Sequence, residues 1–173
     1  MKKILSLFLV LLMAVSLVPM AAAEGVVNVF NWEDYISEDA LKMFEEETGI
    51  KVNYMRFTTN EDMMVQVRTS TGAFDVVFPS DYTVERMIAE DLLEPINFDN
   101  VPNAQHTAQW LQNPSYDPQN QYSVPYMWGT VGILYDTTRV NGPIDSWSVL
   151  FGEEYKGEVF MLDSIRDSLG ITL

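Results

Sequence analysis

Residues 26–35 of this 173-residue chain, VVNVFNWEDY, decide its fold. The stretch begins as an apolar run with β-branched residues, which is typical of a buried strand, and the run stops at Asn31. An indole, two carboxyl groups and a phenol follow directly, from Trp32 to Tyr35. Open α/β sheets bind ligands at the carboxyl ends of their strands. The stretch therefore predicts a strand that presents aromatic and acidic groups to a ligand that is both cationic and apolar.

Strands and helices are expected to alternate over the residues that follow. The expected elements are a helix between the N-cap Ser37 and the C-cap Gly49, a strand at 50–55, a helix with Asn60 as its N-cap, a strand at 74–78 and a helix at 83–90. The glutamates at 45–47 should face water, and Met63 and Met64 should pack in a core. Short connections between such elements predict a parallel sheet with helices on both faces.

The chain changes character after the third expected strand. The tripeptide Ser-Asp-Tyr at 80–82 lies at the carboxyl end of that strand, and residues 93–126 form an irregular segment rich in proline, asparagine and glutamine. This segment contains the single histidine, His106, and one histidine without a second ligand nearby indicates a surface residue rather than a metal site. Further on, the expected elements are a crossover at 124–135, a short helix at 146–151, a strand at 157–162 and a helix that opens at Ile165.

The N-terminal 23 residues have the pattern of a secretory signal peptide. Two lysines precede an apolar stretch that runs to about Met20, and three alanines at 21–23 complete the cleavage site. We therefore expect export and cleavage after Ala23, with an uncleaved membrane anchor as the alternative. The chain has no cysteine, which excludes a disulfide framework and a lipid-modified cysteine in the exported product.

The charge of the chain is strongly negative. Its formal net charge is −15, and removal of Lys2 and Lys3 with the signal peptide makes this −17. Nucleic-acid binding needs clustered lysine and arginine side chains, so this charge argues against a nucleic-acid partner. A negative surface favours a cationic ligand, although many exported proteins are simply acidic.

Four motifs in order resemble those of a known family. They are NWEDY at 31–35, PSDY at 79–82, PYMWGT at 125–130 and LDSIRD at 162–167. With these spacings the chain resembles the N-terminal half of the periplasmic spermidine/putrescine-binding proteins, which are the substrate receptors of polyamine ABC importers. The resemblance covers the chain from Val26 onward.

The resemblance implies a truncated two-lobed α/β fold of the type II periplasmic-binding-protein kind. A parallel-sheet first lobe would occupy residues 24–130, and 131–173 would hold the hinge crossover and the start of a second lobe. We interpret the chain as a fragment because it stops inside its last helix. The expected signal peptide and the absence of cysteine indicate a product that is free in the periplasm or secreted and not membrane-inserted after cleavage. The resemblance further implies a monomer that is not an enzyme, has no cofactor or metal, and works with the membrane permease of an ABC importer.

The resemblance also assigns ligand-binding positions. These are Trp32, Asp34, Tyr35, Ser80, Tyr82, Asp163, Ser164 and Asp167. One position departs from the family pattern, since a ligand-binding aspartate of some spermidine-preferring relatives is replaced here by Ser164, with Asp163 one residue earlier. The preferred polyamine therefore stays open. Carboxylates would bind the ammonium groups, and aromatic rings would cover the methylene groups and attract the charge.

Several alternatives stay open from the residues alone. The same fold could bind a sugar, a thiamine-like cation or ferric iron, and paired carboxylates beside aromatic rings also occur in glycoside hydrolases. Glu33 and Asp34 are adjacent, which is a poor start for two acids that must flank a bond. The structural alternatives for single residues are packing for Trp32, Tyr35, Tyr82 and Trp128, capping for Asp34 and Ser80, and attraction to a helix dipole for Asp163 and Asp167.

Overall fold

A three-stranded parallel sheet forms the centre of the computed structural model, which describes residues 25–172. Its strands are β1 (Gly25–Trp32), β2 (Ile50–Phe57) and β3 (Val76–Val77), in the order β2-β1-β3. β1 pairs with β2 over its full length, from Gly25 opposite Ile50 to Trp32 opposite Phe57. The predicted parallel α/β fold is confirmed. The signal peptide predicted for residues 1–23 lies outside the described residues.

The third strand is shorter than the sequence predicts. Only Val76 and Val77 pair as a strand, opposite Val29 and Phe30, whereas the prediction was 74–78. Single backbone hydrogen bonds continue the ladder at both ends, from Asp75 N to Asn28 O at 2.9 Å and from Phe78 N to Phe30 O at 3.1 Å. Among the described residues β3 has a neighbour on one side only, which leaves its outer edge without a ladder partner.

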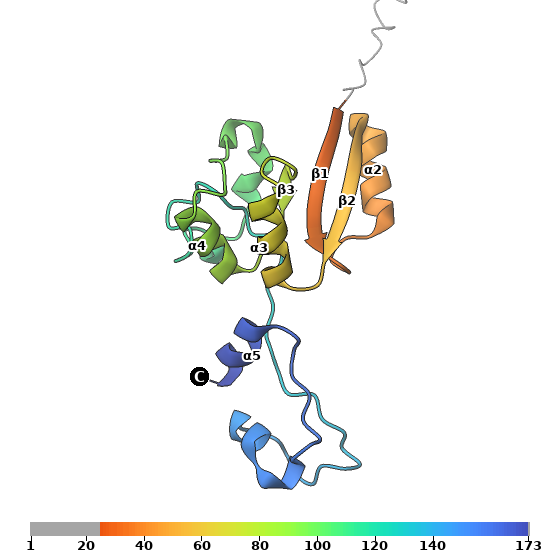
Figure 1. Cartoon of the computed structure of the whole chain (residues 1–173), viewed down its shortest axis with the longest axis vertical. Helices are drawn as coiled ribbons and strands as arrows, with labels where there is room; N and C mark the ends of the chain where they lie inside the picture. Colours follow the sequence, from red (N-terminus) through yellow and green to blue (C-terminus); the bar gives the residue numbers. More distant parts are fainter. Residues whose placement is uncertain (1–24, 173) are drawn as a thin grey trace, which may run out of the picture.

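Helices cover both faces of this sheet, as predicted. α2 (Glu38–Thr48) connects β1 to β2, and α3 (Asn60–Thr69) connects β2 to β3. The two crossovers run in opposite directions across the sheet, so right-handed connections place their helices on opposite faces. Figure 1 shows α2 on one side of β1 and β2, with α3 and α4 (Asp81–Ala89) on the other.

Local capping signals explain where the first helices begin and end. Ser37 Oγ accepts a hydrogen bond from Ala40 N at 3.2 Å, and Gly49 ends α2 with a left-handed φ of 72°, as predicted. The prediction that Asn60 caps the next helix is wrong. Thr59 Oγ1 accepts from Asp62 N at 3.2 Å instead, which frees the Asn60 amide for other partners.

One glutamate of the acidic run does not simply face water. Glu45 Oε1 accepts from Val52 N at 2.8 Å, and Glu45 Oε2 accepts from Lys51 Nζ at 2.7 Å. These two donors hold the pKa of Glu45 below its usual value. The expectation of solvent exposure is therefore wrong for Glu45, which ties α2 to β2. It holds for Glu46 and Glu47, which are exposed.

The hydrophobic core lies between the sheet and the two helices α3 and α4. Its buried members are Phe30, Phe57, Met63, Met64 and Met87, so the methionines pack in the core as predicted. The Phe30 ring meets Phe57 edge-on, with centroids 5.0 Å apart, and stacks on Phe74 at 4.6 Å. This core fixes the sheet and therefore the carboxyl ends of β1 and β3.

The irregular segment after α4 is built from short 3₁₀ turns around one buried carboxylate. Asp117 is 3% exposed and accepts hydrogen bonds from Gln121 N, Tyr122 N, Ser123 N and Ser123 Oγ, at 2.8–3.0 Å. Burial alone would raise the pKa of Asp117, but these four donors outweigh it and lower the pKa. Asp117 therefore holds this segment in place without regular secondary structure.

Residues 127–172 have a different character. The chain leaves the first region as an extended segment, and its short elements are two 3₁₀ turns, Trp147–Phe151 and Glu153–Tyr155, and the helix α5 (Ile165–Thr172) (Figure 1). The strand predicted at 157–162 is wrong, since no strand forms there and Phe160 is 93% exposed. A strand needs a hydrogen-bonded partner, and this part of the chain offers none.

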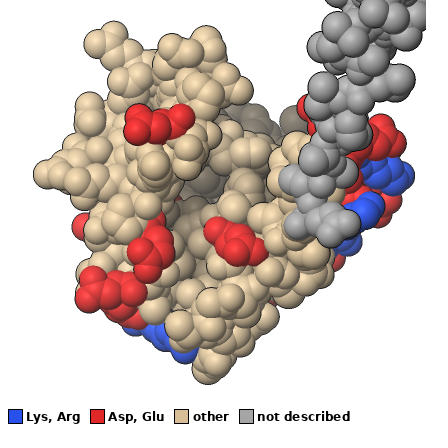
Figure 2. Space-filling model, turned by 90° about the horizontal axis from the view of Figure 1, so that it is seen from above, with Lys and Arg blue, Asp and Glu red and all other residues tan. Residues whose placement is uncertain are grey.

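The charged groups are spread over the face of the molecule that is seen from above. Figure 2 views the molecule from above, at the amino end of β1, and shows acidic side chains in several separate groups, with basic side chains at two edges. The excess of carboxylates on this face is thus spread out rather than gathered at one site. Within residues 25–172, no helix has both the length and the apolar character needed to cross a membrane.

Candidate functional site

The carboxyl end of β1 presents the aromatic and acidic groups that the sequence predicts. β1 ends at Trp32, one residue later than expected, and a turn carries the exposed side chains of Asp34 and Tyr35. The Trp32 ring lies 4.6 Å from Phe57 and 5.8 Å from Tyr35, measured between centroids. Trp32 therefore packs against the edge of the core on one side and meets an exposed phenol on the other.

A tyrosine that was not among the predicted site residues joins the ends of β1 and β3. Tyr126 Oη donates to Tyr35 O at 2.6 Å, and the Tyr126 ring meets Phe78 edge-on at 4.8 Å. Phe78 lies two residues before Ser80. The contact spans 91 residues of sequence, and its one signal in the sequence was the motif at 125–130.

A buried amide holds two predicted site residues together. Asn60 is 2% exposed, and its Nδ2 donates to Ser80 Oγ at 3.0 Å and to Tyr82 Oη at 2.7 Å. Ser80 N donates to Asn60 Oδ1 at 3.1 Å, which fixes the orientation of the amide. No local sequence pattern marks this role, because Asn60 also suits a helix cap. Ser80 occupies the N-cap position of α4, as the capping alternative expects, but its hydroxyl makes no capping bond and instead accepts from Asn60.

The helix α5 places the side chain of Arg166 over the ring of Tyr82. The guanidinium carbon of Arg166 lies 5.4 Å from the centroid of the Tyr82 ring. Figure 1 shows α5 below α3 and α4, on the side to which the carboxyl end of β1 points. Ser164 Oγ accepts from Asp167 N at 3.4 Å, so Ser164 acts at the start of the helix. Asp163 is exposed and Asp167 is half-buried.

Direct contacts connect the predicted aromatic and hydroxyl side chains in two groups, whereas the predicted acidic side chains have no such contacts within the described residues. Trp32 and Tyr35 form one group, and Ser80 and Tyr82 form another through Asn60. Within residues 25–172, no hydrogen bond or ion pair links the carboxyl groups of Asp34, Asp163 and Asp167 to another predicted site residue. Whether these residues share one ligand stays a prediction.

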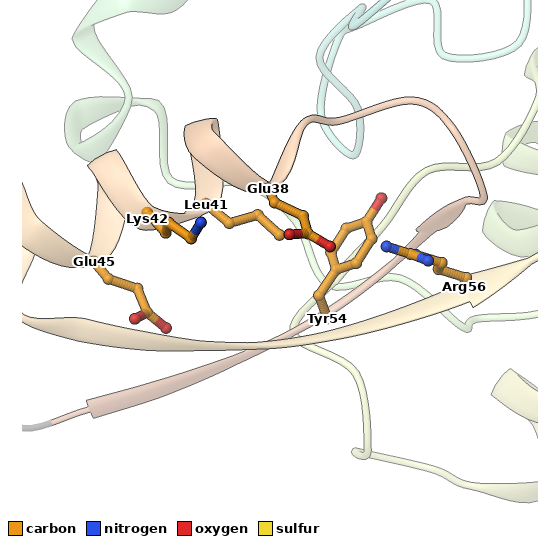
Figure 3. A pocket seen from close by; sticks show the side chains of 6 residues that line it. All are labelled: Glu38, Leu41, Lys42, Glu45, Tyr54 and Arg56. Carbon is orange, nitrogen blue, oxygen red and sulfur yellow. The ribbon is translucent and has the colours of Figure 1, made fainter.

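A separate pocket lies between α2 and β2. Figure 3 shows its lining, and its volume is about 320 Å³. The lining residues are Glu38, Leu41, Lys42, Glu45, Tyr54 and Arg56, none of which is a predicted site residue. Tyr54 Oη donates to Trp32 O at 3.3 Å, and burial raises the pKa of Tyr54. Two acids and two bases balance here, so the pocket has no net charge to attract a cation.

The tryptophan of the 125–130 motif does not pack in a hinge core. Trp128 is exposed, and its ring meets the exposed Trp110 edge-on at 4.9 Å. The packing interpretation therefore holds only in the limited sense that the two indoles contact each other.

Comparisons with known proteins agree with this architecture. The profile of the family described as bacterial extracellular solute-binding protein matches residues 39–173. The chain is 36% identical over 83% of its length to the putrescine-binding periplasmic protein PotF of Escherichia coli, and 34% identical over 83% to the spermidine/putrescine-binding periplasmic protein of Escherichia coli. A solved structure from Listeria monocytogenes, described as a spermidine/putrescine ABC transporter, matches 84% of the chain with 37% identity and a TM-score of 0.79. The chain spans 41–46% of the length of these proteins.

Proposed function

This chain belongs to the family of bacterial extracellular solute-binding proteins, and from this premise we propose that it takes part in capturing polyamines such as putrescine and spermidine. The names of its relatives support this choice, because they bind putrescine or spermidine and are periplasmic. The proposed receptor would pass its ligand to the permease of an ABC importer. Sugars, thiamine-like cations and ferric iron have no such support.

The observation that carries the proposal is the clustering of aromatic and hydroxyl groups at the carboxyl ends of β1 and β3. Tyr126 ties the loop of Tyr35 to Phe78, and Asn60 ties Ser80 to Tyr82. Such a set suits a chain of methylenes interrupted by ammonium groups. Rings cover the methylenes, and each well-placed ring adds about 0.5–2 kcal/mol of attraction to a nearby cation.

The carboxylates complete the proposed site by recognising charge. Asp34 would bind one ammonium group from the first region, and Asp163 or Asp167 would bind another from the second. Each hydrogen bond between an ammonium and a carboxylate contributes roughly 1.5–3 kcal/mol net. Because the acids sit in different regions, ligand binding would draw the regions together by favouring a closed arrangement.

The proposed organisation follows the sequence boundaries. Residues 24–130 would form the first lobe, residues 131–173 the crossover and the start of the second, and residues 1–23 a cleaved signal peptide. The receptor would act as a monomer outside the cytoplasm. The family consists of solute-binding receptors, and we propose that this chain likewise performs no catalysis and needs no cofactor.

Calorimetric titration of the full-length gene product tests this function. The ligands are putrescine, spermidine, glucose and ferric citrate, each at the same ionic strength. We expect heat and saturation with at least one polyamine and none with glucose or iron. Saturation by glucose or iron without polyamine binding would contradict the proposal.

The variant Asp34→Asn tests the role of the first carboxylate. Its exposed side chain makes no hydrogen bond within the described residues, so its loss should leave the melting temperature unchanged. Polyamine affinity should fall by about tenfold or more, which corresponds to one charge-assisted hydrogen bond. A variant that binds as tightly as the wild type would remove Asp34 from the site.

A further inference from the structure

The cationic side chains of this acidic protein fall into two kinds. Eight of its ten lysines and arginines lie within residues 25–172. Six of these eight form ion pairs with Asp or Glu in the described chain. The other two, Arg56 and Arg166, lie instead over the rings of tyrosines, Tyr54 at 5.7 Å and Tyr82 at 5.4 Å.

Arg166 contacts an aromatic ring although two acidic residues are close to it in sequence. Asp163 and Asp167 are three residues before it and one residue after it, on or beside the same helix. No ion pair joins Arg166 to either of them within residues 25–172. Its guanidinium instead reaches Tyr82, which belongs to α4 and lies 84 positions earlier in the sequence. Arg166 is the single basic residue of α5, and its guanidinium therefore lies over an aromatic ring of α4.

Tyr82 is held as a platform for this contact. Its hydroxyl accepts from Asn60 Nδ2 at 2.7 Å, and Asn60 is itself fixed by Ser80 N. The ring is half-buried, so only part of it is accessible to a partner. A cation gains from an aromatic face within about 6 Å of the centroid, and two cations on the same face would repel each other.

We propose that Arg166 is an internal competitor for the Tyr82 ring, so that a ligand ammonium must displace its guanidinium to reach that ring. The inference rests on the proposed polyamine function and adds a residue that limits the affinity of the site. Displacement moves the guanidinium of Arg166 off the face of the Tyr82 ring.

Substitution of Arg166 tests the competition directly. Putrescine is titrated into the full-length wild-type gene product and into Arg166→Gln, Arg166→Lys and Arg56→Gln. Arg166→Gln should bind about two- to fivefold more tightly, which is the size of an exposed cation–aromatic contact. Arg166→Lys, which keeps the cation, should stay close to wild type.

Arg56→Gln is the control, because it removes the same charge from a comparable contact outside the site. Figure 3 shows Arg56 beside Tyr54 in the pocket between α2 and β2. Its putrescine affinity should equal that of the wild type. Arg166→Gln binding that is unchanged or weaker, or equal tightening by Arg56→Gln, would overturn the inference. Absence of polyamine binding by the wild type would instead overturn the proposed function together with this inference.

Nuclear magnetic resonance gives a second measurement that does not depend on a variant with altered affinity. The Nε–H resonance of Arg166 should be shifted upfield by the Tyr82 ring. It should move toward its ordinary position when putrescine saturates the protein, and it should lie there already in Tyr82→Leu. A resonance that is not ring-shifted, or that putrescine leaves in place, would overturn the competition.

Discussion

Residues 25–126 and 127–172 contain similar sequence patterns but have different structures. Val76 and Val77 in the apolar run at 74–78 pair with β1, whereas the apolar run at 157–162 pairs with nothing in the described chain. The six hydrophobic side chains that are buried in the described part of the chain all lie between Phe30 and Met87, and no residue of 127–172 is buried. The difference teaches that an apolar run becomes a strand only where a partner supplies the hydrogen bonds and a core covers one face.

The largest expected effect comes from truncating one phenylalanine in each region. Phe30 is 1% exposed and Phe160 is 93% exposed. Phe30→Ala should lower the free energy of unfolding by about 3–5 kcal/mol, because it leaves a cavity beside Phe57 and Phe74. Phe160→Ala should change it by less than about 0.5 kcal/mol. Urea unfolding of the 173-residue chain measures both, and a large loss with Phe160→Ala would show that this ring is buried in solution.

The next effect concerns the two carboxylates that organise loops. Asp117 is buried with four donors, and its removal in Asp117→Ala should cost about 2–4 kcal/mol of unfolding free energy. Asp136 in the second region accepts from Thr138 N and Thr138 Oγ1 but is exposed. Asp136→Ala should therefore be much milder in the same urea experiment. Equal losses would mean that burial does not separate the two regions.

Asn60 should affect both stability and binding, because its buried amide makes three hydrogen bonds. Asn60→Ala should cost about 1–3 kcal/mol of unfolding free energy. It should also weaken polyamine binding in the full-length protein, since Ser80 and Tyr82 lose their common support. In the double variant with Ser80→Ala and Tyr82→Phe already present, Asn60→Ala should no longer weaken binding.

Asn53 provides the matched control for that experiment. It is exposed, and its Nδ2 donates to Asn28 Oδ1 at 2.9 Å, away from the predicted site. Asn53→Ala should leave polyamine affinity unchanged. If Asn60→Ala weakens binding equally in the wild type and in the Ser80→Ala, Tyr82→Phe background, Asn60 does not act through these two residues.

The smallest expected effect is a pH dependence of the unfolding free energy, and it comes from Glu90 in residues 25–126. The carboxylate of Glu90, at the end of α4, pairs with Arg68 of α3 and with Arg86 of α4. These ion pairs link the two helices and lower the pKa of Glu90 from 4.5 to about 2. A carboxyl group whose pKa is lower in the folded protein stabilises it above the unfolded pKa, and the stability is lost as the pH falls toward the folded value. The loss should therefore occur between pH 4.5 and about 2, and Glu90→Gln should remove this part of the dependence. Unfolding measured as a function of pH tests this, and an unchanged profile in the variant would contradict it.

Signals that act over a few residues were predictable. The apolar runs of β1 and β2, the cap at Ser37 and the glycine at Gly49 each leave a pattern within one or two turns of the chain. The family motifs likewise pointed to the carboxyl ends of β1 and β3. These patterns gave the parallel α/β fold and the candidate positions at Trp32 and Tyr82.

Contacts across many residues were not predictable. Asn60 has the same local pattern whether it caps a helix or supports Ser80 and Tyr82, and only the fold distinguishes the two. Tyr126 and Arg166 reach partners far away in sequence, so no spacing marks them. The failed strand at 157–162 has the same cause, because pairing depends on a partner that its own sequence does not specify.

A crystal structure of the full-length gene product with a bound polyamine tests the proposed site most directly. We expect the methylenes to lie against the rings of Trp32 and Tyr82, an ammonium group to bind Asp34, and the guanidinium of Arg166 to be away from Tyr82. A polyamine bound elsewhere, for example in the pocket of Glu38 and Arg56, would contradict the assignment of these residues.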